Sequence, residues 1–208
     1  MTAPAVPQVW LDRVRGLLAA KPRVLLGLVG APGSGKSTLA ETLLNIFADL
    51  AQIVPMDGYH LANVQLARLG RAGRKGAPDT FDSAGYVALL RRLRTQAADE
   101  TVYAPEFRRE IEEPVASAIA VLPERRLVIT EGNYLLLDDG PWGQVAPLLD
   151  EAWYVDVDDT LRTARLTARH ERFGRSRDEA LAWVAGTDEP NARLIAATRH
   201  RAHAVFSW

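Results

Sequence analysis

Residues 24–38 read VLLGLVGAPGSGKST, and this stretch decides the fold. Its first part, Val24 to Val29, is a continuous apolar run that predicts a strand buried on both faces. The second part meets the G-x-x-x-x-G-K-[ST] pattern from Gly30 to Ser37, and helical periodicity follows in STLAETLLNIFADL (37–50). A strand, a glycine loop and a helix in this order predict a phosphate-binding loop within an α/β fold.

The residue types in this loop suit the binding of a nucleoside triphosphate. The glycines at 33 and 35 let successive backbone N–H groups turn toward phosphate oxygens, and the following helix adds its positive end. Lys36 is expected on the β and γ phosphates, and the Ser37 hydroxyl is expected to ligate Mg²⁺. No N-K-x-D motif is present to read the base, so the sequence leaves ATP against GTP open. The predicted nucleotide-binding residues are Gly30, Ala31, Pro32, Gly33, Ser34, Gly35, Lys36, Ser37 and Thr38.

The composition excludes several other classes of protein. The chain has 208 residues, 48% of them apolar and 25% charged, which fits one globular domain over residues 1–208. Lys and Arg number 25 against 26 Asp and Glu, so the basic excess of a nucleic-acid binder is missing. Without cysteine there can be no disulfide, thiolate zinc site or cysteine nucleophile. No apolar run is long enough to span a membrane and no signal peptide is visible, so a cytoplasmic protein is expected.

Apolar periodicity predicts alternating strands and helices, which is typical of a parallel sheet covered by helices on both sides. Helices are expected at 7–21, 37–50, 83–95, 158–174, 178–186 and 191–203. Ser83 and Asp188 are expected at the starts of the third and the last of these. Residues 103–115 hold two prolines among charges and are expected to form an ordered loop or an edge hairpin. The five expected strands are Val24–Val29, Ile53–Met56, Leu127–Thr130, Trp153–Asp156 and Ala204–Trp208.

Two carboxylates that follow predicted strands are candidates for the chemistry. Glu131 is the first charge after the strand VIT, and it suits Mg²⁺, which uses few protein ligands and keeps several waters. Asp156 also ends a strand, but ranks lower because the acids at 158 and 159 suit the cap of the next helix. Asp57 follows the strand IVP, where a side chain points into the crevice at the carboxyl end of a parallel sheet. It is the candidate base for an alcohol acceptor, with a turn aspartate before Gly58 as the alternative.

Arg162, Arg165, Arg169 and Arg172 recur at helical spacing and share one predicted face. Such a row fits either a solvated basic face or a lid whose guanidinium groups close on the transferring phosphate. Arg165 and Arg169 are the candidates for stabilising charge. Arg172 and Arg175 are further members, because a glycine between them gives the segment a joint. A closing lid would also exclude water from the reaction.

Together these motifs resemble the P-loop kinases that include uridine kinase, phosphoribulokinase and bacterial pantothenate kinase. The resemblance runs in order through GAPGSGKST, MDGYH, RKGAPDTFD, YAPEFRREIEEP, ITEGNYLL and DVDDTLRTARLTARH, from Val24 to the last strand. The chain is particularly similar to a branch labelled nucleoside kinase-like, or kinase of a fructose transport system. The resemblance implies a three-layer P-loop NTPase fold with a five-stranded parallel sheet in the order 2-3-1-4-5. It also implies an acceptor-side insertion at about 58–115 and an Arg-rich lid at about 162–177.

The resemblance further implies an ATP- and Mg²⁺-dependent kinase. The γ-phosphate would go to a hydroxyl of a small metabolite: a sugar, a sugar phosphate, a nucleoside or a pantothenate-like compound. Asp57 takes the place of the family's catalytic aspartate, and Glu131 that of its Walker-B-type acid. The segment from Arg74 to Asp82 is similar to an acceptor-side segment of pantothenate kinases. The candidate acceptor-binding residues are Tyr59, His60, Arg74, Phe107 and Arg109.

The chain departs from the family pattern on the acceptor side. The aromatic residue and the acid expected after the AP dipeptide are Phe107 and Arg108 here, and Arg109 comes next. An arginine in place of an acid reverses the charge of this wall, which makes an anionic acceptor such as a sugar phosphate conceivable. The alternative function is a regulatory P-loop NTPase whose hydrolysis acts on a partner protein. The identity of the acceptor and the oligomeric state stay open, and a homodimer is compatible with the sequence.

Overall fold

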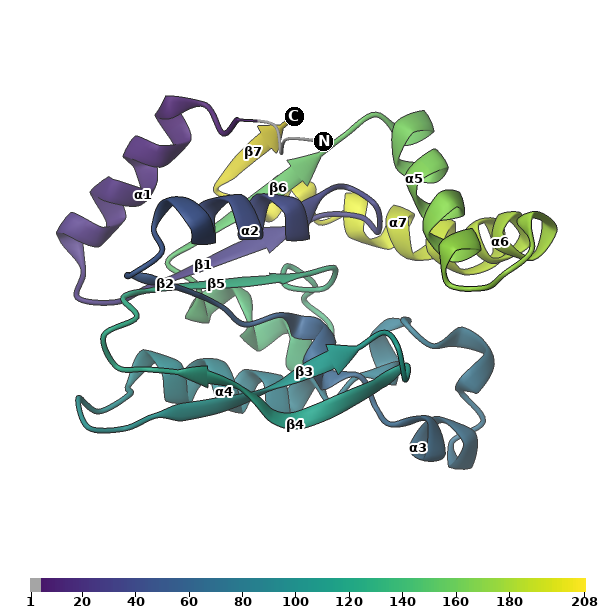
Figure 1. Ribbon diagram of the computed structural model, residues 1–208, viewed down its shortest axis with the longest axis horizontal. Helices are drawn as coiled ribbons and strands as arrows, with labels where there is room; N and C mark the ends of the chain where they lie inside the picture. Colours follow the sequence, from purple (N-terminus) through teal and green to yellow (C-terminus); the bar gives the residue numbers. More distant parts are fainter. Residues whose placement is uncertain (1–4) are drawn as a thin grey trace.

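The computed structural model describes residues 5–208, and a parallel five-stranded sheet forms its centre (Figure 1). The spatial order of the strands is β2-β5-β1-β6-β7, and each neighbouring pair runs parallel. Counted along the chain without the two strands of a separate hairpin, this is the order 2-3-1-4-5. The expected fold is therefore confirmed. The strands are β1 (Val24–Val29), β2 (Ala51–Ile53), β5 (Leu127–Gly132), β6 (Glu151–Asp156) and β7 (Ala204–Ser207).

Helices cover both faces of the sheet, because its central strands β1 and β5 are apolar and fully buried. One face packs against α1 (Gln8–Ala20) and α2 (Lys36–Ile46). The other face packs against α4 (Ser83–Arg94), and Ile195 of α7 (Glu189–Ala196) joins that core. The three layers place the carboxyl ends of the parallel strands beside the loop that precedes α2 (Figure 1).

A second sheet lies apart from the main one, below it in Figure 1. It consists of β3 (Val102–Arg108) and β4 (Glu113–Val121), paired antiparallel. A hairpin in this region was one of the two expected outcomes, but it forms a sheet of its own instead of an edge of the main sheet. Val102 and Val121 are fully buried on its inner side. The short α3 (Asn63–Arg68) and β3 lie within the predicted acceptor-side insertion of about 58–115, whereas β4 extends beyond its predicted end.

The predicted second strand, Ile53–Met56, is wrong at both ends, because β2 already begins at Ala51 and shares only Ile53 with the prediction. The reason for its early end is local. β2 stops at Ile53 instead of Met56, because Pro55 has no N–H to donate and a 3₁₀ turn (Met56–Tyr59) begins there. This turn packs tightly against the hairpin: a Cβ on Gly58 would lie 2.2 Å from the Pro105 carbonyl oxygen. The candidate base Asp57 is part of the same turn.

Aspartates cap two of the helices near the site. Asp158 caps α5 (Asp159–Arg172) as expected, accepting a hydrogen bond from the first helical turn at 3.0 Å. The cap of α4 is Asp82 and not Ser83, since the Asp82 Oδ1 accepts a hydrogen bond from the Gly85 N–H at 2.8 Å. A carboxylate at this position also interacts favourably with the positive end of the helix.

The C-terminal helical region corrects the prediction of two separate helices. Helix α6 (Arg177–Trp183), a π-turn (Val184–Asp188) and α7 follow one another without a break. Asp188 therefore lies inside a continuous helical segment and caps nothing; its side chain contacts His170 instead. In the part of the chain that the structure describes, no helix is both long enough and apolar enough to cross a membrane.

Candidate active site

The glycine loop adopts the conformation that phosphate binding requires. Gly33 and Gly35 have φ angles of +82° and +92°, in the left-handed region that favours glycine. Gly35 directly precedes α2, so the first N–H groups of that helix are directed at the loop. The Lys36 side chain is buried, and its Nζ donates a hydrogen bond to the Ala31 carbonyl oxygen at 3.1 Å. The loop is thus folded as an anion cradle.

One large cavity, of about 940 Å³, joins this loop to the acceptor-side insertion. Ligand sites commonly measure roughly 300–1,000 Å³, so the cavity has room for a nucleotide and a second small molecule. The loop contributes Pro32, Gly33, Gly35, Lys36, Ser37 and Thr38 to its wall. The other predicted site residues that line it are Asp57, His60, Phe107, Arg109, Glu131, Arg165, Arg169 and Arg175.

Three charged groups interact beside the loop. Burial, and next the charge of Asp57, raise the pKa of the Glu131 carboxyl. Burial lowers the pKa of the Lys36 ammonium, and the charges of Glu131 and Asp57 oppose that lowering. Glu131 and Lys36 are therefore both desolvated, and Asp57, whose side chain is 28% exposed, lies near enough for its charge to act on both. The space beside these groups is where a γ-phosphate held by the loop would lie.

The residues expected at Mg²⁺ fit that ion. The Ser37 Oγ donates a hydrogen bond to the Glu131 Oε1 at 3.1 Å, so the two oxygen donors lie side by side. Within residues 5–208 no group of three or more His, Cys, Asp or Glu side chains is arranged to hold a metal. A Mg²⁺ at Ser37 and Glu131 would therefore take its remaining ligands from phosphate and water oxygens, as this ion commonly does.

His60, Phe107 and Arg109 form the wall next to Asp57. The His60 ring lies between the rings of Phe81 and Phe107, with centroids 4.0 and 4.6 Å away. Its Nδ1 lies 2.8 Å from the Asp57 carbonyl oxygen, and burial lowers the pKa of the ring. The Arg109 Nη2 donates a hydrogen bond to the Asp57 Oδ2 at 3.3 Å. The carboxylate of the candidate base thus contacts a guanidinium, and an imidazole contacts the main-chain carbonyl of the same residue.

Two of the predicted acceptor residues lie outside the cavity. Tyr59 packs against Tyr86 in the core, with ring centroids 5.4 Å apart, and burial raises the pKa of its hydroxyl to about 12. Arg74 forms a two-point ion pair with Asp79, with Nη1 and Oδ1 2.8 Å apart. Neither side chain is free to bind an acceptor in this arrangement, so neither is retained as a candidate.

The predicted row of arginines divides between different surroundings. Arg165 and Arg169 line the large cavity, whereas Arg172 is exposed and outside it. Desolvation by the surrounding protein, and next the charge of Arg109, lower the pKa of the Arg169 guanidinium. The group stays protonated at neutral pH. Guanidinium groups from α5 and from the hairpin therefore line the same cavity.

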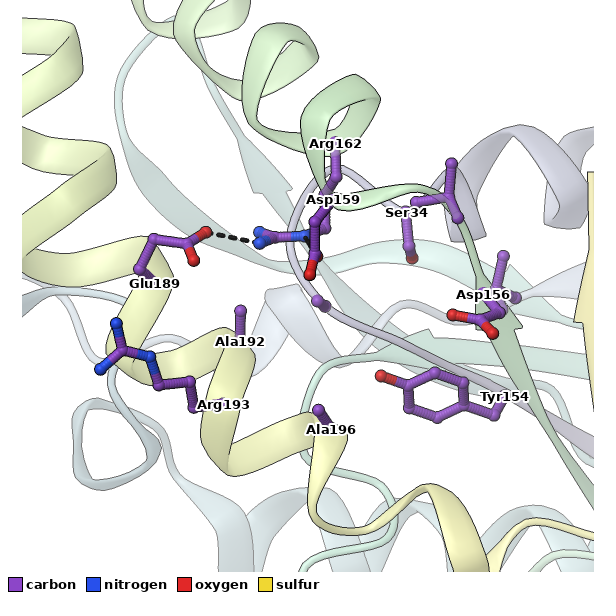
Figure 2. A pocket seen from close by; sticks show the side chains of 12 residues that line it. Ser34, Tyr154, Asp156, Asp159, Arg162, Glu189, Ala192, Arg193 and Ala196 are labelled. Atoms are coloured by element: carbon purple, nitrogen blue, oxygen red, sulfur yellow. Dashed lines mark hydrogen bonds and ion pairs between the residues drawn. The ribbon is translucent and has the colours of Figure 1, made fainter.

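Arg162 does not belong to the large cavity. Its side chain is only 2% exposed, and it forms ion pairs with Asp159, at 2.9 Å, and with Glu189 of α7 (Figure 2). These side chains, with Ser34 and Tyr154, line a separate cavity of about 100 Å³ behind the loop (Figure 2). Arg162 therefore anchors α5 to α7, and the expectation of a lid or solvated role for it is wrong.

Several residues of the large cavity were not predicted. The His170 Nε2 lies 2.8 Å from the Asp188 Oδ2, and this pair closes one side of the cavity. No sequence spacing signals the pair, because a π-turn sets the direction of Asp188. Asn133, by contrast, lies in the motif ITEGNYLL, and that motif was a signal that could have identified it. The cavity residues that the prediction missed include Asn63, Asn133, His170 and Trp208, whereas Lys75 lies in the segment 74–82 that was expected on the acceptor side.

The family model of the phosphoribulokinase / uridine kinase family matches residues 25–208. The chain belongs to this family. A Schizosaccharomyces pombe protein named “Putative uridine kinase C227.14” is 38% identical over 168 residues, which are 76% of this chain and 71% of that protein. The “ATP-dependent kinase-like protein notR'” of Aspergillus versicolor is 42% identical over 152 residues, which are 69% of this chain and 88% of that protein.

The structural comparison agrees with the sequence comparison. A crystal structure described as a “putative fructose transport system kinase” from Silicibacter sp. TM1040 superposes with a TM-score of 0.84 and 37% identity. The superposition covers 97% of this chain and 100% of the chain in that crystal structure. The resemblance inferred from the ordered motifs is thereby confirmed. This phosphoribulokinase / uridine kinase family member is a P-loop, ATP-dependent small-molecule kinase.

Proposed function

We propose that this family member transfers the γ-phosphate of ATP to a hydroxyl group of a small polar metabolite. The observation that carries the proposal is the shared cavity, whose wall contains both the phosphate loop and the carboxylate of Asp57. A nucleotide gripped by the loop would direct its γ-phosphate toward that carboxylate. A small molecule on the His60 and Phe107 side would meet both groups at once.

Asp57 is the group that this proposal assigns to the acceptor. As the acceptor oxygen forms its bond to the γ-phosphorus, the bond from that phosphorus to the β–γ bridging oxygen breaks, and its electron pair leaves with ADP. The hydroxyl proton passes to the Asp57 carboxylate, which also holds the oxygen in line. A side chain that is 28% exposed and lines the cavity is accessible for this transfer.

Charge stabilisation is assigned to the groups around the phosphates. Lys36 lies in the loop itself, and Arg165 and Arg169 extend from α5 into the same cavity. Cations placed where negative charge spreads during transfer lower the barrier most effectively in a region sheltered from water. Mg²⁺ at Ser37 and Glu131 would neutralise charge on the β and γ phosphates.

The proposal is tested with γ-labelled ATP and a panel of nucleosides, sugars, sugar acids, sugar phosphates and pantothenate. Asp57→Asn should lower kcat for the acceptor that is used by about 10²–10⁴-fold while leaving ATP affinity nearly unchanged. Asp99→Asn is the matched control, because Asp99 is exposed and does not line the cavity. Label released as free phosphate, with no acceptor labelled by the wild type, would contradict the proposal and favour a regulatory NTPase.

A further inference from the structure

Arg109 binds the carboxylate of the candidate base Asp57 through a weak contact that another anion could replace. It follows β3 directly, and its guanidinium reaches back to the Asp57 carboxylate with a single contact of 3.3 Å. A strong arginine–carboxylate pair uses two parallel hydrogen bonds of roughly 2.7–2.9 Å. The contact seen here is one-point and long, and the Arg109 side chain is 35% exposed to the cavity. A better-fitting anion could therefore displace it.

A second cation lies close to Arg109 on the acceptor side. The Arg109 Cζ is 5.9 Å from the centroid of the Phe107 ring, and the Lys75 Nζ is 5.1 Å from the same centroid. Both cations line the cavity; the Lys75 Nζ donates a hydrogen bond to the Asn63 Oδ1 at 2.7 Å and lies 4.0 Å from a Glu112 carboxylate oxygen. The wall that would contact the acceptor therefore places two cations beside an aromatic ring, and each is held to its acid, Glu112 or Asp57, only by a long ion-pair contact.

We infer that the acceptor carries a carboxylate or phosphate near the hydroxyl that is phosphorylated, and that Arg109 recognises this anion. The inference rests on the proposed function. When the acceptor binds, its anion draws the Arg109 guanidinium away from Asp57 and forms the two-point contact that Asp57 does not. The Asp57 carboxylate is then free to accept the hydroxyl proton. Without an acceptor, Arg109 keeps the carboxylate engaged, so water is a poor substitute.

The matched variants are Arg109→Ala, Arg109→Lys and Arg108→Ala. Arg108 is the exposed neighbour, lies outside the cavity and pairs with Glu106 at 2.6 Å, so its loss controls for a change of charge on the hairpin. Thermal unfolding of each variant establishes that the fold is retained. Arg109→Lys keeps the charge but not the two-point geometry, so it should rescue anion recognition only in part.

The first measurement compares acceptors that differ only in the anion: glycerol, glycerate and glycerol phosphate, and ribose, ribonate and ribose 5-phosphate. The wild type should prefer the acids or the phosphates, and the two arms distinguish a carboxylate from a phosphate. Arg109→Ala should reduce kcat/KM for the preferred anionic acceptor by about 10- to 100-fold and should not reduce it for the neutral acceptors, whereas Arg108→Ala should leave both nearly unchanged. A wild type that prefers the neutral compounds, or an unchanged preference in Arg109→Ala, overturns the inference.

The second measurement separates this inference from the proposed function. ATP hydrolysis without any acceptor should rise at least about threefold in Arg109→Ala, because the Asp57 carboxylate is released toward water, and Asp57→Asn/Arg109→Ala should abolish the rise. Hydrolysis that does not rise overturns the masking of Asp57, even if acceptors are phosphorylated. If the wild type phosphorylates only neutral acceptors, the anionic class fails while the kinase proposal stands.

Discussion

Replacing Gly58 by alanine tests whether the position of the candidate base depends on the hairpin. A Cβ at this position would lie 2.2 Å from the Pro105 carbonyl oxygen and 2.7 Å from its carbonyl carbon, both backbone atoms. An ordinary contact begins at 3.4 Å, so the turn and β3 must separate by about 1.2 Å. Overpacking of this kind costs about 1–3 kcal/mol of unfolding free energy. For a chain of 208 residues, that corresponds to a fall in Tm of about 2–12 °C.

The same separation moves Asp57, the residue before Gly58, relative to the phosphate loop. Because a misplacement of about 1 Å can reduce a rate by about 10²-fold, kcat should fall by one to two orders of magnitude while ATP affinity changes little. Gly73→Ala is the control, since a Cβ there meets nothing within 4 Å and the change should leave Tm equal or slightly raised. Calorimetry and steady-state kinetics measure both effects. Gly58→Ala with wild-type Tm and kcat would refute the packing of the turn on the hairpin.

Three further changes probe the lid, the metal ligand and the core. Arg169→Ala should lower kcat by about 10²-fold or more without a comparable loss of ATP binding, whereas Arg172→Ala, outside the cavity, should change neither; equal effects would remove the lid role. Since burial raises the pKa of Glu131, a fall in pH toward and through that raised value should protonate the carboxyl and weaken Mg²⁺ activation. Glu131→Gln should need about 10- to 100-fold more Mg²⁺ and lose this pH dependence; a Mg²⁺ titration at several pH values decides. Tyr86→Phe should cost about 1 kcal/mol in denaturant unfolding, because the buried Tyr86 hydroxyl hydrogen-bonds the Thr130 hydroxyl, and an unchanged midpoint would contradict that bond.

The phosphate loop and the acids at the strand ends could be predicted because local rules place them. The glycines at 33 and 35 allow φ values that other residues avoid, and Lys36 begins the helix that follows. Glu131 lies at the carboxyl end of β5, and Asp57 lies in the 3₁₀ turn that follows β2; the carboxyl ends of parallel strands meet at one edge of a sheet. Placing them in one cavity therefore needed only the alternation of strands and helices and the sheet order that the resemblance implied.

Side-chain direction outside those elements could not be predicted in the same way. The spacing from Arg162 to Arg172 predicts a shared helical face, but it does not predict which of these arginines pairs with Glu189 of α7. Arg162 forms an ion pair with Glu189, 27 positions further along the chain, whereas Arg165 and Arg169 line the cavity. Tyr59, two residues after Asp57, turns into the core because a 3₁₀ turn begins where a strand was expected.

The amino-acid sequence alone determined the anion cradle, the apolar strands and the family to which the chain belongs, since these follow from backbone conformation and periodicity over a few residues. Only the tertiary structure decided which cations line the cavity beside Asp57. Arg109 and Asp57 are 52 positions apart, and their contact depends on the hairpin folding back onto the 3₁₀ turn. Long-range packing fixes such pairs, because the energy of one ion pair is too small to select the fold that creates it.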